Sequence, residues 1–130
     1  MPAFQQVLDR GALRPRQRAV QPKEILWIRR LDKSGQSWQP HSIPLPESTG
    51  IAKAVSAGDI DGNGRLDLVF SCEQAKAPYH GLMWLSAGGP PHAGPWLPHA
   101  ISGSDGIKHD LVSLVDLDAD GDLDAITTEE

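Results

Sequence analysis

Short runs of apolar or alternating residues recur along the chain, each five to seven residues long and bounded by turn residues. Runs of this length between Gly, Pro, Asn and Asp favour β-strands over helices. The pattern predicts eight strands, at residues 25–30, 38–43, 54–58, 66–72, 81–86, 96–101, 111–115 and 123–128, with a Gly- and Pro-rich loop at 87–95. We therefore expect an all-β fold.

The pattern also repeats with a period of 57 or 58 residues. Residues 25–28 return as 82–85, residues 38–43 return as 96–101, and the acidic stretch 59–67 returns as 116–124. One period contains four strands, and four-stranded antiparallel units of this length that stack face to face build β-propellers. We expect a partial β-propeller of about two four-stranded blades, in which a basic arm (1–22) precedes a half blade (23–48), a full blade (49–105) and a half blade (106–130).

Two such units do not close a ring, because propellers need about four to eight blades. Three outcomes follow from this: the chain is a fragment of a longer propeller, it associates with its own copies through open blade edges, or it leaves faces exposed. The chain ends directly after a strand, which favours the fragment.

Each period contains a nine-residue loop with carboxylates or amides at positions 1, 3, 5 and 9 and a glycine at position 6. Ca²⁺ takes six to eight oxygen ligands, and alternate residues of a tight loop point their oxygens at one centre while the glycine permits the bend. The sequence therefore predicts two calcium sites, with the carbonyl of position 7 also contributing. The candidate ligands are Asp59, Asp61, Asn63, the Arg65 carbonyl and Asp67 in loop one, and Asp116, Asp118, Asp120, the Asp122 carbonyl and Asp124 in loop two.

An acidic hairpin turn without metal is the simpler alternative, since Asp-Gly and Asn-Gly favour turns by themselves. Crowded like charges cost on the order of 3–4 kcal/mol per pair at an effective dielectric of 20, and loop two places five aspartates in nine residues. This crowding and its recurrence favour calcium. Loop two has more carboxylate ligands, so we expect it to bind calcium more tightly than loop one.

The two loops and their flanking strands resemble the FG-GAP/VCBS repeats, the calcium-binding blades of integrin-α-like propellers. The resemblance covers residues 23–130, without the Phe-Gly and Gly-Ala-Pro signatures of that family. It implies a calcium loop between the first two strands of each blade, formed by the same residues. It also implies an extracellular, cell-surface or periplasmic protein that serves as a scaffold for binding or adhesion to a protein or carbohydrate ligand.

Composition narrows the possible partners. Residues 1–23 hold five of the 12 basic residues but only one of the 17 acidic ones, so the rest of the chain is strongly acidic and nucleic acid is an unfavourable partner. No apolar run approaches the roughly 20 residues of a membrane span, and no secretory signal precedes the body. Cys72 is the single cysteine, so no internal disulfide is available.

The remaining aromatic and titratable residues divide according to whether they repeat. The repeated pairs Trp27/Trp84, Trp38/Trp96 and His41/His99 are expected to be structural, with each histidine capping a strand end. The residues without a counterpart are Lys76, Tyr79, His80, His92, Lys108 and His109. His109 and Asp110 form a candidate acid/base pair, although an exposed loop histidine is the favoured interpretation. We therefore expect a non-enzymatic calcium module, the alternative being a fragment of a secreted propeller enzyme, a sugar lyase or dehydratase.

Overall fold

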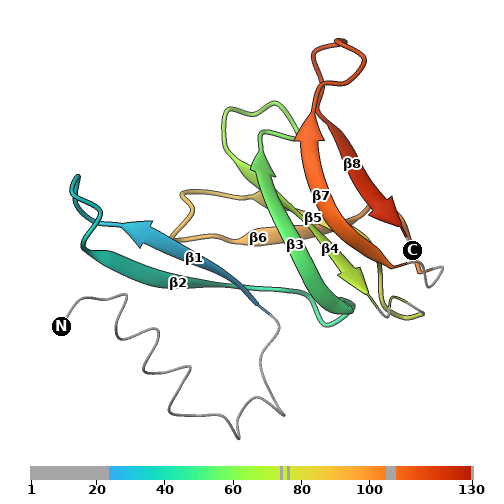
Figure 1. Cartoon of the computed structure of the whole chain (residues 1–130), viewed down its shortest axis with the longest axis horizontal. Helices are drawn as coiled ribbons and strands as arrows, with labels where there is room; N and C mark the ends of the chain where they lie inside the picture. The colour runs from blue at the N-terminus through green and yellow to red at the C-terminus, as the bar shows by residue number, and fades with distance from the viewer. Residues whose placement is uncertain (1–23, 74, 76, 105–107, 130) are drawn as a thin grey trace, which may run out of the picture. The chain divides into compact units, whose positions relative to one another are not determined.

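The computed structural model describes residues 24–73, 75, 77–104 and 108–129. The predicted basic arm (1–22) and Lys76 lie outside these residues. Within them the chain forms eight strands in three antiparallel sheets and no helix, so the predicted all-β class is confirmed (Figure 1). The strands are β1 (Glu24–Arg30), β2 (Trp38–Pro44), β3 (Ile51–Gly58), β4 (Asp67–Glu73), β5 (Leu82–Ala87), β6 (Trp96–Ala100), β7 (His109–Val115) and β8 (Asp124–Glu129).

All eight predicted strands form, but two of them begin two or three residues earlier than the apolar pattern indicates. β3 starts at Ile51 rather than at residue 54, and it continues through Lys53, whose ammonium lies 3.7 Å from the Glu73 carboxylate on the neighbouring strand. β7 likewise starts at His109 rather than at residue 111. Polar residues extend both strands because cross-strand charge pairs and burial replace the apolar contacts that the pattern requires.

The chain divides into two compact units, the first ending at Leu45 and the second beginning at Pro46. In the first unit β1 pairs with β2, with Trp27 directly opposite His41. Their rings stack with centroids 4.8 Å apart. Trp84 and His99 stack in the same way at 4.2 Å in the second unit, so the expectation that these histidines cap strand ends is wrong. Each histidine instead covers a tryptophan face across the strand pair.

The turn after β1 is organised by Asp32. The backbone amides of Gly35, Gln36 and Ser37 donate to its Oδ1 at 3.0, 3.1 and 3.3 Å. Desolvation by burial would raise the pKa of the Asp32 carboxyl, but these amides and the Ser34 hydroxyl together lower that pKa below its ordinary value. The carboxylate therefore serves as a turn-forming acceptor.

The second unit contains a four-stranded sheet in the order β3-β4-β5-β6 and a separate β7–β8 hairpin. Cross-strand pairs such as Ser56↔Val69 and Val69↔Trp84 place every second side chain on one face, called here the covered face. β7 lies alongside β3 against this face (Figure 1). Val69 and Leu82 form a buried cluster there with Val112 of β7. The sheet and the hairpin are thus packed face to face.

Backbone and hydroxyl contacts hold the hairpin close to the covered face. Ser56 Oγ donates to the Val112 carbonyl at 2.6 Å, and Ser71 Oγ donates to the Asp110 carbonyl at 3.3 Å. A Cβ at Gly58 would lie 2.8 Å from Cδ1 of Leu114 and of Leu123. The missing side chain at Gly58 therefore leaves the room that these two leucines occupy.

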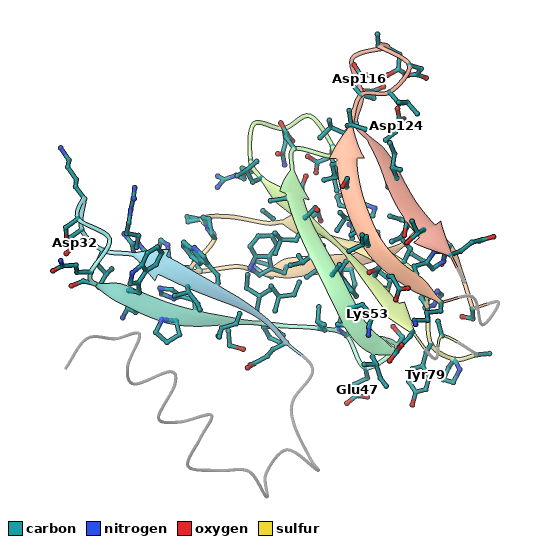
Figure 2. All side chains as sticks on the ribbon, viewed as in Figure 1. Asp32, Glu47, Lys53, Tyr79, Asp116 and Asp124 are labelled. Carbon is teal, nitrogen blue, oxygen red and sulfur yellow. The ribbon has the colours of Figure 1, made fainter. Side chains whose placement is uncertain are left out.

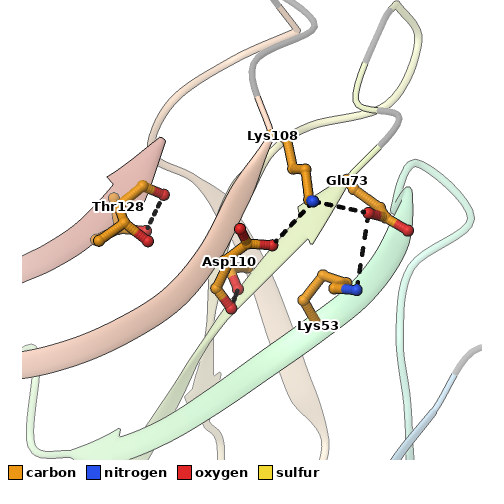
Figure 3. Close-up of polar contacts among 7 residues, drawn as sticks. Lys53, Glu73, Lys108, Asp110 and Thr128 are labelled. Carbon is orange, nitrogen blue, oxygen red and sulfur yellow. Dashed lines mark hydrogen bonds and ion pairs between the residues drawn. The ribbon is translucent and has the colours of Figure 1, made fainter. Parts of the chain in front are cut away.

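Both hairpins of this unit have a register irregularity at the same repeat position, between Ala52 and Ala54 in β3 and between His109 and Val112 in β7. Next to these bulges, Lys108 lies 3.8 Å from Glu73 and 3.4 Å from Asp110, and it joins the two hairpins through these ion pairs (Figure 3). The bulges and charges fix the end of the hairpins opposite to their acidic loops.

Candidate metal centre

The two acidic loops are the turns of two equivalent hairpins. Loop one, residues 59–67, connects β3 to β4, and loop two, residues 116–124, connects β7 to β8. Figure 2 shows loop two projecting beyond its strands, with Asp116 at one side and Asp124 at the base. The loops lie where the repeat pattern predicts them.

The carboxylate at position 1 organises each loop in the same way. Asp59 accepts hydrogen bonds from the amides of Asn63 at 3.1 Å and Gly64 at 2.8 Å. Asp116 accepts the equivalent bonds from Asp120 at 3.1 Å and Gly121 at 2.9 Å. Each loop is thereby folded back on its first residue.

Position 5 repeats this correspondence. The Asn63 side-chain oxygen accepts from the Arg65 amide at 2.9 Å, and Asp120 accepts from the Asp122 amide at the same distance. The Asp122 amide lowers the pKa of the Asp120 carboxyl below its ordinary value, with smaller contributions in the same direction from Asp118 and Asp116. Asp120 therefore carries its negative charge more readily than an isolated aspartate.

Position 9 closes the loop, but in two different environments. Asp67 Oδ2 accepts from the Ile60 amide at 2.9 Å, as Asp124 Oδ2 accepts from the Leu117 amide at 3.0 Å. Asp67 is fully buried, and its Oδ1 also accepts from the Ala87 amide on β5 at 3.0 Å. Asp124 lies half-buried. The first loop is thus anchored to the sheet by its last carboxylate.

The backbone takes left-handed conformations at the same positions in both loops. At position 6 the φ angles are 88° for Gly64 and 97° for Gly121. At position 4 they are 74° for Gly62 and 60° for Ala119, the one described residue other than glycine with a positive φ. Alanine in this region costs roughly 1–2 kcal/mol, so loop two adopts the shared shape under strain.

Three carboxylates gather in each loop. Oxygens of Asp59, Asp61 and Asp67 all lie within 4.8 Å of one another, and so do those of Asp116, Asp118 and Asp120. Oxygens bound to one ion at about 2.3–2.6 Å lie at most about 5 Å apart, so either group could hold a metal ion. The second group contains Asp120 at position 5, whereas the first contains Asp67 at position 9. Ligation by Asn63, Asp124 and the carbonyls of Arg65 and Asp122 stays a prediction.

The candidate acid/base pair does not have the expected environment. His109 is only 5% exposed, in β7, so the interpretation as an exposed loop histidine is wrong. Neither of its ring nitrogens has a hydrogen-bond partner among the described residues, so Asp110 does not orient the ring. The Asp110 carboxylate instead pairs with Lys108. In this structure His109 and Asp110 therefore do not form the hydrogen-bonded pair that general acid/base catalysis uses.

The other residues without a repeat counterpart lie on connections. His80 lies in the β4–β5 connection, where its amide donates to the Ser48 carbonyl at 2.9 Å. Tyr79 is its exposed neighbour (Figure 2), and His92 is exposed in the loop between β5 and β6. Cys72 is buried in β4.

Sequence reasoning missed the residues that hold the two hairpins together. Ser56 and Ser71 donate hydrogen bonds from the covered face to β7, and Gly58 leaves room there for Leu114. A signal was present for the two serines, because Ser56 returns as Ser113 and Ser71 returns as another hydroxyl residue, Thr128, one period later. Polar residues inside strands do not indicate by themselves which backbone they meet.

Comparisons with protein-family models, curated proteins and solved structures found no match to this chain. Among the described residues there is no helix long and apolar enough to cross a membrane.

Proposed function

We propose that this chain is a non-enzymatic calcium-binding module built from β-propeller-type repeats. The four-stranded sheet follows the chain order β3-β4-β5-β6, which is the connectivity of a blade. The β7–β8 hairpin packs on its face and repeats the first half of that unit. The fold supports the proposal, and the acidic loops supply its chemistry.

The observation that carries the proposal is the shared frame of the two loops. Their position-1, position-5 and position-9 side chains accept equivalent backbone hydrogen bonds 57 residues apart, and each loop gathers three carboxylates. A turn without metal needs neither the crowding nor its repetition.

Among the described residues, the aspartates of the two loops form no ion pair. The ion pairs in this part of the chain join Lys53 and Lys108 to Glu73 and Asp110. Like charges held this close favour a divalent cation. Calcium fits better than magnesium, because it accepts irregular sets of carboxylate and carbonyl oxygens whereas Mg²⁺ demands near-ideal octahedral geometry.

Bound calcium would stiffen the turn between the first two strands of each repeat. An affinity of about 10⁻⁴ to 10⁻³ M, the range of extracellular modules, suits a location outside the cytoplasm. The module would then serve as a rigid scaffold for a protein or carbohydrate ligand.

Thermal unfolding with and without calcium tests this function. At ten times the dissociation constant each site adds about 1.4 kcal/mol to the free energy of unfolding, so millimolar calcium should raise the melting temperature by several degrees. The double variant Asp61→Ala, Asp118→Ala should lose this rise, and magnesium should give a smaller one. An unchanged melting temperature in calcium would refute the proposal.

A further inference from the structure

The outer face of the β7–β8 hairpin exposes a row of apolar side chains. Leu111 is 66% exposed, Ile126 43% and Val115 39%. Ser113 pairs directly with Ile126, and Val115 pairs with Asp124 at the end of the same ladder. Three aliphatic side chains on one side of a two-stranded hairpin form an apolar surface that water does not favour.

The internal repeat indicates what kind of surface covers this row. Moved back by 57 residues, Leu111, Ser113 and Ile126 correspond to Ala54, Ser56 and Val69. These lie on the covered face, where β7 packs against them through Val112 and Leu114. The exposed row is therefore the repeat equivalent of a surface that is already an interface within this chain.

Hydroxyl groups repeat with the apolar row. Ser56 and Ser71 donate to backbone carbonyls of β7. Their equivalents one period later are Ser113 and Thr128, and both are exposed. The hairpin thus presents both donors that fasten the existing interface.

The complementary surface lies on the other face of β3. Val112 and Leu114, which pack on the covered face, correspond to Val55 and Ala57. Val55 is 47% exposed and Ala57 is exposed as well. Among the described residues, both halves of a second interface of the same kind are therefore present and exposed.

Side-chain volumes match across this second interface. In the existing one, Gly58 makes room for Leu114. In the second interface, Val115 stands at the position of Gly58, and Ala57 stands at the position of Leu114. The large and the small side chain of the contact thus exchange places. Such an exchange preserves the combined volume that a packed interface requires.

The open edges of β8 and β1 support the same second interface as the exposed faces. β4 pairs with β5, with Val69 opposite Trp84. Their repeat equivalents are β8 and β1, which belong to two separate two-stranded sheets. Pairing of Ile126 in one copy with Trp27 in a second copy would complete a second four-stranded sheet and would satisfy the open edges of β8 and β1.

From these correspondences we infer that a second copy of this chain docks on the β7–β8 hairpin. The β3 strand of the second copy covers Leu111, Val115 and Ile126, and its β1 strand pairs with the β8 edge. The contact is heterologous, since it joins different surfaces of the two copies. The inference that the partner is a second copy depends on the repeat and does not depend on calcium binding.

Sedimentation of the full chain over a concentration series in EDTA tests the inference. The wild type should form species larger than a monomer. Ile126→Asp spoils the hairpin face and Val55→Asp spoils the β3 face, and each variant alone should lose association by about tenfold or more because a charge replaces a buried aliphatic group. Leu31→Asp, at an exposed leucine of the first unit, is the matched control and should associate like the wild type.

Mixing the variants distinguishes this contact from any other. Ile126→Asp and Val55→Asp each keep one intact surface, so their mixture should form dimers and stop there. Hydrogen exchange should slow at residues 25–28 and 126–128 in the wild-type assembly. Circular dichroism checks that each variant is folded. If Ile126→Asp or Val55→Asp does not fold, Ser113→Arg takes its place on the hairpin face and Ala57→Arg on the β3 face. A monomeric wild type, a monomeric mixture of folded variants or unprotected β8 amides would overturn the inference.

Discussion

The two acidic hairpins share a loop frame but differ in what surrounds the strands below it. Loop one connects strands of a four-stranded sheet whose covered face meets β7, and its Asp67 is buried against β5. Loop two ends a two-stranded hairpin with an exposed outer face, and its Asp124 is half-buried. The same nine-residue motif therefore has the same internal hydrogen bonds in both loops, but in loop one it is also anchored to a neighbouring strand of the sheet.

The largest expected difference concerns position 9. In EDTA, Asp67→Ala should lower the free energy of unfolding by about 3 kcal/mol, because it leaves the part-buried Ile60 amide and the buried Ala87 amide without their charged acceptor. Asp124→Ala removes one described bond near the surface and should cost about 1 kcal/mol. Urea denaturation measures both values.

Asp67→Asn is the matched control, because it keeps one acceptor oxygen in place. The free energy of unfolding of Asp67→Asn should lie between that of the wild type and that of Asp67→Ala. Equal losses for Asp67→Ala and Asp124→Ala would show that the sheet does not distinguish the two loops.

A smaller effect is expected at position 4, where the loops differ by one methyl group. Ala119→Gly should stabilise loop two by about 1 kcal/mol, since it relieves the strain of a left-handed alanine, and Gly62→Ala should destabilise loop one by a similar amount. No heavy atom lies within 4 Å of a Cβ placed at Gly62, so packing does not interfere. Thermal unfolding of the reciprocal pair in EDTA measures the exchange, and changes of the same sign would contradict it.

The strands could be predicted from the sequence, whereas their partners across the sheet interface could not. The apolar runs and the repeat located all eight strands and both loops. They failed where polar residues extend a strand, as at Lys53, and where burial opposes polarity, as at His109. A periodic pattern reports which side chains leave water, but it does not report which surface they meet.

The loop carboxylates show the same limit. Their spacing predicted two groups of converging oxygens, and the structure brings three carboxylates together in each. The anchoring of Asp67 by the Ala87 amide could not be predicted, because it depends on a strand 20 residues away. The carbonyl ligands at Arg65 and Asp122 stay predictions.

The smallest expected effect is on the loss of stability at acidic pH. The pKa of Asp120 lies below its ordinary value of 3.8 in the folded chain, chiefly because of the Asp122 amide. A lowered folded pKa contributes stability that is present above the ordinary value and is lost as the pH falls through the lowered one. Asp120→Asn should therefore flatten the fall in stability below about pH 4 in EDTA. Chemical denaturation at several pH values measures this, and an unchanged acid profile would contradict the assignment.

Calorimetric titration of calcium into the calcium-free chain tests the central claim most directly. The account predicts two sites per chain with dissociation constants of about 10⁻³ M or lower. Asp118→Ala should remove the tighter site, because loop two carries more carboxylates, and Asp61→Ala the weaker one. A titration without saturable heat, or one whose stoichiometry is unchanged in both variants, would contradict calcium binding by these loops.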